Sequence, residues 1–282
     1  MTRIPLPRRY AVVVSVLAVL AWAGLAPAAV MPYVQNFASD PGWTTGTAGA
    51  VDAGNTWAKA ASGQWAMQVA RTGSGSITEW SSVSISNVTA AGFEVQATLN
   101  MPSLCTNGFN DSVGLRFLAA SATSDTSSYD ADVNIGDQNP GRIRIVAFNS
   151  SGAATIYPSS TQTSQGGPVP NFNRTGTYLL DVKGTYNTAG ALTVDFKVTD
   201  ELNSANTSEV TNLVLNGVTV GPDTNPPSGQ YFGFRAGIGS SGAASLDSNF
   251  SNFSVTAAPE PASLALVALG GLLLLPRRRA RH

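Results

Sequence analysis

Residues 93–101 read FEVQATLNM, and in this stretch apolar side chains alternate strictly with polar ones. Because successive side chains of a β-strand point to opposite faces of a sheet, such a stretch buries one face and exposes the other. The same alternation occurs in residues 129–135 (YDADVNI) and 192–199 (LTVDFKVT). The pattern predicts strands of an antiparallel sheet, with one face packed on a core and the other facing water.

The chain on either side of these three stretches is also typical of strands. Further strands are expected at residues 65–71, 77–86, 112–119, 142–148, 177–184, 210–216, 230–238 and 249–256. Turn-forming residues separate them, as in Asn139-Pro140-Gly141. No stretch between these strands keeps the helical i, i+3, i+4, i+7 spacing of apolar residues. The prediction is an all-β domain over residues 30–258, folded as a two-sheet antiparallel jelly-roll sandwich.

The register of one hairpin can be predicted from its alternation. If the isoleucines of residues 142–148 share the buried face with the apolar residues of the preceding strand, the arginines must share the other face with the aspartates. A slip of one residue would turn the arginines toward the core. We therefore expect Asp132 beside Arg144 or Arg142, with Asp130 on that same face, and we expect this face to be exposed to water.

Three segments of the predicted domain resemble the concanavalin A-like lectin and glucanase superfamily. They are the early segment from Phe37 to Gly42-Trp43, the strand at residues 114–117 (GLRF) and the closing strand at residues 249–255 (NFSNFSV). The resemblance covers most of the predicted domain and implies a jelly roll that handles carbohydrate. A galactose-binding-like jelly roll is the alternative fold.

The first 29 residues have the three parts of a secretory signal peptide. Arginines precede an apolar run at residues 11–25 (AVVVSVLAVLAWAGL), and small residues follow at the cleavage region, Ala26, Ala28 and Ala29. An apolar run of this length is short for a membrane span. We expect the Sec translocon and signal peptidase to process residues 1–29; the alternative is an N-terminal anchor helix.

The last 24 residues combine three features in a fixed order. Pro259-Glu260-Pro261 precedes the apolar residues 262–275 (ASLALVALGGLLLL), and an arginine cluster with Arg277, Arg278 and Arg279 follows. Fourteen helical residues would extend about 21 Å, less than the roughly 30 Å of a bilayer core. The arginines would remain on the cytoplasmic side. Together these features predict a transient stop-transfer segment.

Residues 259–282 resemble the PEP-CTERM sorting signal of Gram-negative bacteria, which has the same triplet, short apolar helix and terminal arginines. The resemblance implies recognition by an exosortase, cleavage near the Pro-Glu-Pro triplet and transient inner-membrane association through residues 262–275. It further implies export to the cell surface or extracellular matrix of an organism that makes extracellular polysaccharide. The alternative is an ordinary tail anchor.

The charge of the predicted domain differs from that of the whole chain. The chain of 282 residues has 16 Lys and Arg against 17 Asp and Glu, a net charge of −1. Seven of the basic residues but only one acid, Glu260, lie in the two end segments, so the domain between them is acidic. Its few basic residues are scattered and form no stripe, which excludes nucleic acid as a partner.

Residue counts exclude several kinds of chemistry. The chain has one Cys, Cys105, and one His, His282, which lies in the predicted sorting segment. Neither an intrachain disulfide, nor a Cys/His zinc site, nor a Ser-His-Asp or Cys-His nucleophile can be assembled. Asp130 and Asp132 are the remaining candidates for a catalytic pair, because glycosidases need only two carboxyl groups. The predicted register places arginines beside them, which argues against catalysis.

Calcium is the metal that the domain favours, since it prefers the oxygen ligands of Asp and Asn. Asp40 beside the opening strand and Asp247 beside the closing one would meet if those strands are neighbours. Two other groups of residues are alternative calcium ligands: Asn107, Asn110 and Asp111, and Asp137 and Asn139. The remaining alternative is that all of these side chains are solvated turn residues that bind no metal.

Four tryptophans lie close together in the predicted domain: Trp43, Trp57, Trp65 and Trp80. An exposed indole can stack on a sugar ring, whereas sandwich cores also use tryptophan, and for each of the four the core is favoured. The predicted function is that of an exported, non-catalytic protein that binds polysaccharide or has a structural role in the matrix. The alternative is a glycan-processing enzyme, a hydrolase or lyase, that uses Asp/Glu pairs on a concave sheet.

Overall fold

The computed structural model describes residues 29–49, 56–73, 75–86, 88, 92–101, 111–134, 142–152, 154–157, 175–186, 192–215, 229–239 and 244–258. The predicted signal peptide up to residue 28 and the sorting segment 259–282 lie outside these ranges. Within them, no helix is long and apolar enough to cross a bilayer.

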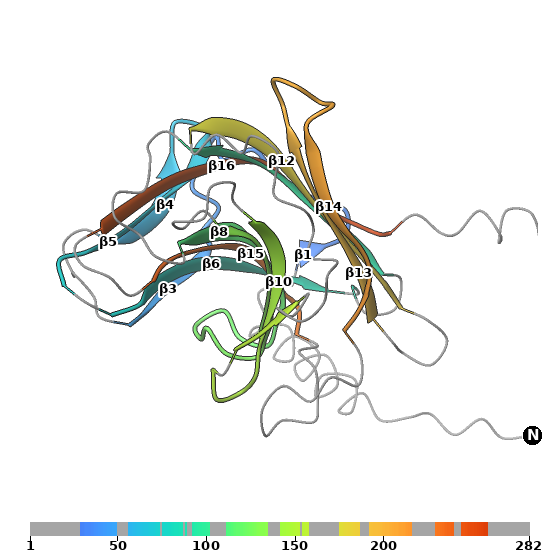
Figure 1. The fold of residues 1–282 in the computed structure, drawn as a ribbon, viewed down its shortest axis with the longest axis horizontal. Helices are drawn as coiled ribbons and strands as arrows, with labels where there is room; N and C mark the ends of the chain where they lie inside the picture. The colour runs from blue at the N-terminus through green and yellow to red at the C-terminus, as the bar shows by residue number, and fades with distance from the viewer. Residues whose placement is uncertain are drawn as a thin grey trace, which may run out of the picture.

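The described strands form two sheets that face each other (Figure 1). The sheet drawn below, here the lower sheet, has the order β1-β6-β15-β8-β9-β10-β11, with β3 also paired to β6. Its strands are β1 (Ala29–Val30), β3 (Thr44–Gly49), β6 (Ile77–Ser86), β8 (Ser112–Ala119), β9 (Ser128–Asn134), β10 (Arg142–Phe148), β11 (Ala154–Tyr157) and β15 (Tyr231–Ile238). Apart from the short parallel pair of β1 with β6, its pairings are antiparallel.

The upper sheet has the order β14-β13-β12-β7-β16-β5-β4, with β2 paired to β16. Its strands are β2 (Tyr33–Gln35), β4 (Trp57–Ala61), β5 (Gln64–Arg71), β7 (Phe93–Met101), β12 (Gly176–Tyr186), β13 (Leu192–Asp200), β14 (Thr207–Val214) and β16 (Ala244–Thr256). Figure 1 shows the upper sheet arched over the lower one, so the outer face of the lower sheet is its concave side. The all-β sandwich is therefore confirmed.

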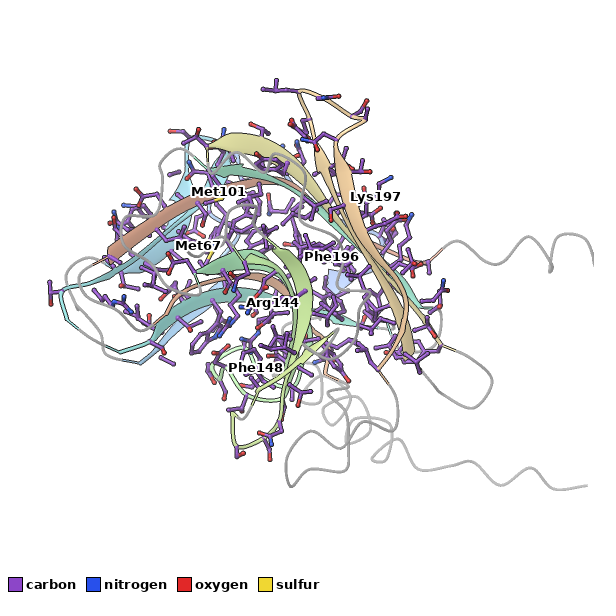
Figure 2. All side chains as sticks on the ribbon, viewed as in Figure 1. Met67, Met101, Arg144, Phe148, Phe196 and Lys197 are labelled. Carbon is purple, nitrogen blue, oxygen red and sulfur yellow. The ribbon has the colours of Figure 1, made fainter. Side chains whose placement is uncertain are left out.

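The core lies between the sheets and is built by the alternation seen in the sequence. All five apolar residues of β7 are buried, and Figure 2 shows Met67 and Phe196 in the same layer. At one end, Phe37, Trp43 and Phe234 pack with ring centroids 5.2–5.9 Å apart. Aromatic side chains bury large apolar areas, and this cluster joins β15 to the segment that precedes β3.

Most expected strands are present, and four coincide with observed ones: residues 77–86 with β6, 93–101 with β7, 112–119 with β8 and 142–148 with β10. Strands β1, β2, β3, β4 and β11 were not expected. Strand β3 (TTGTAG) has no apolar alternation because it lies at an edge of the lower sheet with its side chains largely exposed. Its backbone pairing to β6, and not its side chains, makes it a strand.

Candidate ligand-binding site

The predicted register of the β9–β10 hairpin is confirmed. Arg144 lies directly opposite Asp132, and its Nε donates to Asp132 Oδ1 over 2.6 Å, with Nη2 and Oδ2 3.2 Å apart. Asp130 is on the same face, as expected, two residues along the strand. The pair is therefore a bidentate ion pair on the outer face of the lower sheet.

The expectation that this face is exposed to water is wrong. Asp130 is 0% exposed and Asp132 2%, and Arg116, on the same face of β8, is 0% exposed. The loop between β8 and β9 covers them, because its Asp125 accepts hydrogen bonds from Arg116 and from Arg235 of β15. Alternation determines which residues share a face of a sheet, but it carries no information about a loop that folds over that face.

Beneath the loop, Arg116, Arg235, Asp125 and Asp130 form a continuous chain of ion pairs, next to the pair of Arg144 and Asp132. Asp125 Oδ1 is 2.9 Å from Arg116 Nη1 and 3.1 Å from Arg235 Nε, and Arg235 Nε is also 3.1 Å from Asp130 Oδ2. The guanidinium of Arg116 additionally donates to the carbonyl of Ser124 and lies 5.5 Å from the Trp80 ring. We call this set, completed by the pair of Arg144 and Asp132, the arginine cluster.

Asp130 is the least satisfied member of the arginine cluster. Neither of its carboxylate oxygens has a hydrogen-bond partner of good geometry, despite the nearby Arg235. Burial raises its pKa to about 7, against the opposing effects of Arg235 and Arg116. Burial alone would lower the pKa of Arg235, but Asp125 and Asp130 together raise it. The arginines thus remain charged, and Asp130 is the member that can change its charge.

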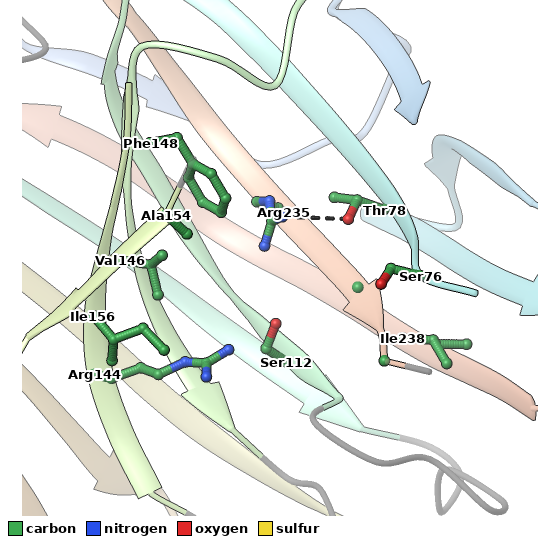
Figure 3. Close-up of a pocket in the computed structure, with 12 residues that line it drawn as sticks. Ser76, Thr78, Ser112, Arg144, Val146, Phe148, Ala154, Ile156, Arg235 and Ile238 are labelled. Carbon is green, nitrogen blue, oxygen red and sulfur yellow. Dashed lines mark hydrogen bonds between the residues drawn. The ribbon is translucent and has the colours of Figure 1, made fainter. Parts of the chain in front are cut away.

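A hollow of about 230 Å³ lies beside the arginine cluster on the outer face of the lower sheet (Figure 3). Its polar side comes from Arg144, Arg235 and hydroxyl groups that include that of Ser112. Its apolar side comes from residues of β10 and β11: Val146, Phe148, Ala154 and Ile156. Strand β11 pairs with β10 at the sheet edge, so Ala154 and Ile156 extend the apolar side beside Val146 and Phe148 of β10, the strand that also carries Arg144.

The two arginines of the hollow keep unused donors. The hydrogen bonds of Arg144 and Arg235 engage Nε and Nη2 of each guanidinium. Among the described residues, neither Nη1 has a partner, and neither is sealed from solvent. The ring of Phe148 lies 4.6 Å from the Arg235 guanidinium, and Ile156 is 45% exposed. The hollow therefore combines two fixed cationic donors with an apolar wall.

The predicted catalytic pair does not lie in a state suited to acid–base catalysis. Asp132 is held by both nitrogens of the Arg144 fork, and Asp130 is sealed beneath Arg235. A general acid or base must lie within hydrogen-bond reach of the substrate atom whose proton it transfers, and neither carboxyl group lines the hollow. The hollow is lined instead by arginines, hydroxyl groups and apolar side chains.

Three of the four tryptophans considered as candidates for stacking on sugar rings are buried. For these three, the favoured expectation of a place in the core is confirmed. Trp43, Trp65 and Trp80 are 7%, 2% and 3% exposed, so they cannot present a ring face to a sugar. Their indole nitrogens donate to Tyr33, to Ser81 and to the carbonyl of Ala122, respectively. Trp57, on β4, is half-buried, and its Nε1 donates to Gln68.

The two predicted calcium ligands have separate partners. Asp40 Oδ1 accepts from the amide of Gly42 over 2.8 Å, and Asp247 Oδ1 accepts from Gln68 Nε2 over 3.0 Å. Within the described residues there is no cluster of three or more His, Cys, Asp or Glu side chains placed to hold a metal. Asp111 accepts from the amide of Gly239, while the other alternative ligands lie outside the described residues. Calcium binding stays a prediction.

Sequence reasoning anticipated Arg144 but missed Arg116, Arg235 and the hollow. A signal was available in two predicted strands, since GLRF and GFRAG each place one arginine between two apolar residues. A lone charge in an otherwise apolar strand needs a buried partner. Its partner, Asp125, lies in a loop whose path the sequence pattern does not predict.

No protein-family model matches the chain, and no curated protein is similar to it. Solved structures with a similar course of the chain include the CBM2 module of evolved Dit from Lactobacillus casei BL23 phage J-1, at 14% identity, a TM-score of 0.43 and coverage of 79% of this chain and 93% of that one. Lectin II from Ulex europaeus has 10% identity, a TM-score of 0.41 and coverage of 80% and 98%. Alginate lyase Aly36B has 13% identity, a TM-score of 0.39 and coverage of 81% and 98%.

Proposed function

We propose that this chain is a non-catalytic protein that binds polysaccharide in the hollow beside the arginine cluster. The observation that carries the proposal is the composition of the hollow, where Arg144, Arg235 and Ser112 lie beside Val146 and Phe148. Sugar recognition needs polar donors for hydroxyl groups and an apolar surface for the ring face, and the hollow has both. The similar solved structures add no support to this proposal, because their identities and TM-scores are low.

The proposed setting is the outside of a Gram-negative cell. It rests on the resemblance of the first 29 residues to a signal peptide and of residues 259–282 to a PEP-CTERM signal. In this proposal the Sec translocon, signal peptidase and exosortase act on the ends. The domain between them is acidic and free of histidine, and it works at the cell surface or in the extracellular matrix beside extracellular polysaccharide.

A glycan-processing enzyme is the second candidate, and one observation favours it. Asp130 has a pKa raised to about 7 by burial, as catalytic acids often do. Its carboxyl group, however, is covered by the arginine cluster and lines no part of the hollow. The geometry supports binding better than catalysis.

A glycan array probed with the purified protein, with and without calcium, tests the proposal. We expect binding to at least one extracellular polysaccharide and no cleavage of it. The variant Arg144→Lys should weaken that binding, because lysine lacks the planar fork with its spare donor. Lys197→Gln, on the exposed outer face of β13, should leave it unchanged. Absence of any binding would leave a purely structural role, and hydrolysis or elimination products would favour the enzyme.

A further inference from the structure

The ligand of the hollow can be narrowed by the chemistry of its donors. Two guanidinium groups, those of Arg144 and Arg235, line the hollow (Figure 3), and their hydrogen bonds within the described residues engage Nε and Nη2 but leave each Nη1 unused. A guanidinium matches a carboxylate better than a hydroxyl group, because charge-assisted hydrogen bonds are roughly twice as strong as neutral ones. The described lining contributes no acidic side chain that could satisfy them.

The size and the apolar wall of the hollow indicate what carries this carboxylate. At about 230 Å³ the hollow is smaller than the pockets of roughly 300–1,000 Å³ that enclose drug-sized ligands, so it suits a single ring unit. Val146, Phe148 and Ile156 give that ring an apolar surface beside the arginines. A sugar acid has this combination of a ring face and a carboxylate at one edge.

The charge balance of the arginine cluster adds a second constraint. Three arginines face three aspartates, so the cluster is neutral when every member is ionised. A ligand carboxylate in the hollow adds one negative charge to this buried group. Asp130 is the acid whose two oxygens lack hydrogen bonds, so it can accept a proton without breaking one.

The surroundings of Asp130 agree with this assignment. The charged groups around it are Arg116 of β8, Arg235 of β15, Asp125 of the covering loop and Asp132 of β9, and Asp132 is itself paired with Arg144 of β10. The arginines cannot release protons near neutral pH, and Asp125 and Asp132 are each held by hydrogen bonds to a guanidinium fork. Proton uptake is therefore left to Asp130.

We propose that the hollow binds the carboxylate of a uronic acid residue of a polysaccharide through Arg144 and Arg235, and that Asp130 takes up a proton when it binds. This inference rests on the proposed function and names its ligand class. Binding and protonation are then reciprocally linked, since each favours the other. The affinity must fall as the pH rises through the range in which free Asp130 loses its proton, by at most tenfold per pH unit for one proton.

The test is a calorimetric titration of the purified protein with trimers of galacturonate, glucuronate and mannuronate and with their carboxyl-reduced, neutral counterparts. We expect at least one acidic trimer to bind and its neutral counterpart to bind at least tenfold more weakly. Buffers of different ionisation enthalpy should reveal uptake approaching one proton near pH 8. Asp130→Asn, which imitates the protonated acid, should bind with little proton uptake and little dependence on pH.

Two variants separate a lost site from a lost fold. Arg144→Lys keeps a cation beside Asp132, and we expect it to bind the acidic trimer at least tenfold more weakly. Ser112→Asp places a carboxylate in the hollow itself, next to the arginines that would neutralise it, and should abolish binding while the protein stays folded by circular dichroism.

Four results would overturn the inference. Equal binding of acidic and neutral trimers, or proton uptake that persists in Asp130→Asn, would refute it while leaving polysaccharide binding intact. Binding of acidic trimers that is unchanged by both Arg144→Lys and Ser112→Asp would move the site elsewhere. If no glycan of either kind binds, here or on the array, the proposed function fails as well.

Discussion

The outer faces of the two sheets arise from the same alternation of apolar and polar residues, but one face is exposed to solvent and the other is largely buried. On the upper sheet, Lys183 pairs with Glu94 and Asp181 and its side chain is 42% exposed, and Figure 2 shows Lys197 on the outside of the molecule. On the lower sheet, the side chain of Arg116 also points to the outer face, but Arg116 is 0% exposed. An outward-facing polar residue is therefore exposed only if nothing folds over it.

This difference changes what the charges contribute. Ion pairs in water are worth about 0–1 kcal/mol, because solvent already stabilises each charge. In a buried cluster the loss of one partner leaves a charge without compensation, which typically costs about 3–5 kcal/mol. The same kind of substitution should therefore have very different effects on the two faces.

The largest effect is expected for Asp125→Asn. It leaves Arg116 and Arg235 without their shared acid, and arginine cannot relieve the imbalance by losing a proton. We expect the free energy of unfolding to fall by about 3–5 kcal/mol in urea denaturation at pH 7. Glu209→Gln, a matched loss of an exposed acid on β14, should change it by less than about 0.5 kcal/mol.

Arg116→Met sharpens the same comparison. Here the cluster keeps an excess acid, and Asp130 can take up a proton in response. We expect a smaller loss than for Asp125→Asn at pH 6, growing as the pH rises toward 8. Losses for Asp125→Asn and Glu209→Gln that agree within error would show that the lower face is not a buried ionic layer.

A third environment, the space between the sheets, is tested by Glu79→Gln. Glu79 is 2% exposed, and burial raises its pKa to about 7, although a hydrogen bond from Thr47 opposes the shift. Because the folded state holds this proton more tightly than the unfolded chain, the contribution of Glu79 to stability falls as the pH rises from about 4.5 to 7. The variant should be more stable than the wild type at pH 8, by on the order of 2–3 kcal/mol.

Thermal and urea unfolding between pH 5 and pH 8 measure this effect. The advantage of Glu79→Gln should shrink toward pH 5. A constant difference between Glu79→Gln and the wild type across this range would contradict the assignment.

The smallest expected effect concerns the close approach of β8 and β9 beneath the arginine cluster. A Cβ at Gly114 would lie 2.0 Å from the carbonyl oxygen of Ala131, a backbone atom that cannot move aside cheaply. Gly114→Ala should cost about 1–3 kcal/mol. Gly73→Ala, where a Cβ meets no atom within 4 Å, should be near neutral, and equal unfolding midpoints for the two would refute the close approach.

How far the sequence predicts this molecule follows from the same comparison. Period-2 alternation depends on one strand at a time, so it correctly predicted β6, β8, β10 and the pairing of Arg144 with Asp132. Burial of the outer face depends on Asp125, which contacts Arg235 from 110 residues away in the chain. The apolar wall depends on the short edge strand β11. Such contacts between distant segments leave no periodic signal.

The central claim is that the hollow of the lower sheet, and not the exposed face of the upper sheet, binds polysaccharide. The most direct test is a calorimetric titration of the polysaccharide identified on the array against Arg144→Lys and Lys197→Gln, each confirmed to be folded. We expect the affinity to fall at least tenfold for Arg144→Lys and to stay within about twofold of the wild type for Lys197→Gln, where tenfold corresponds to about 1.4 kcal/mol. An unchanged affinity for Arg144→Lys, or equal losses for both variants, would contradict the claim.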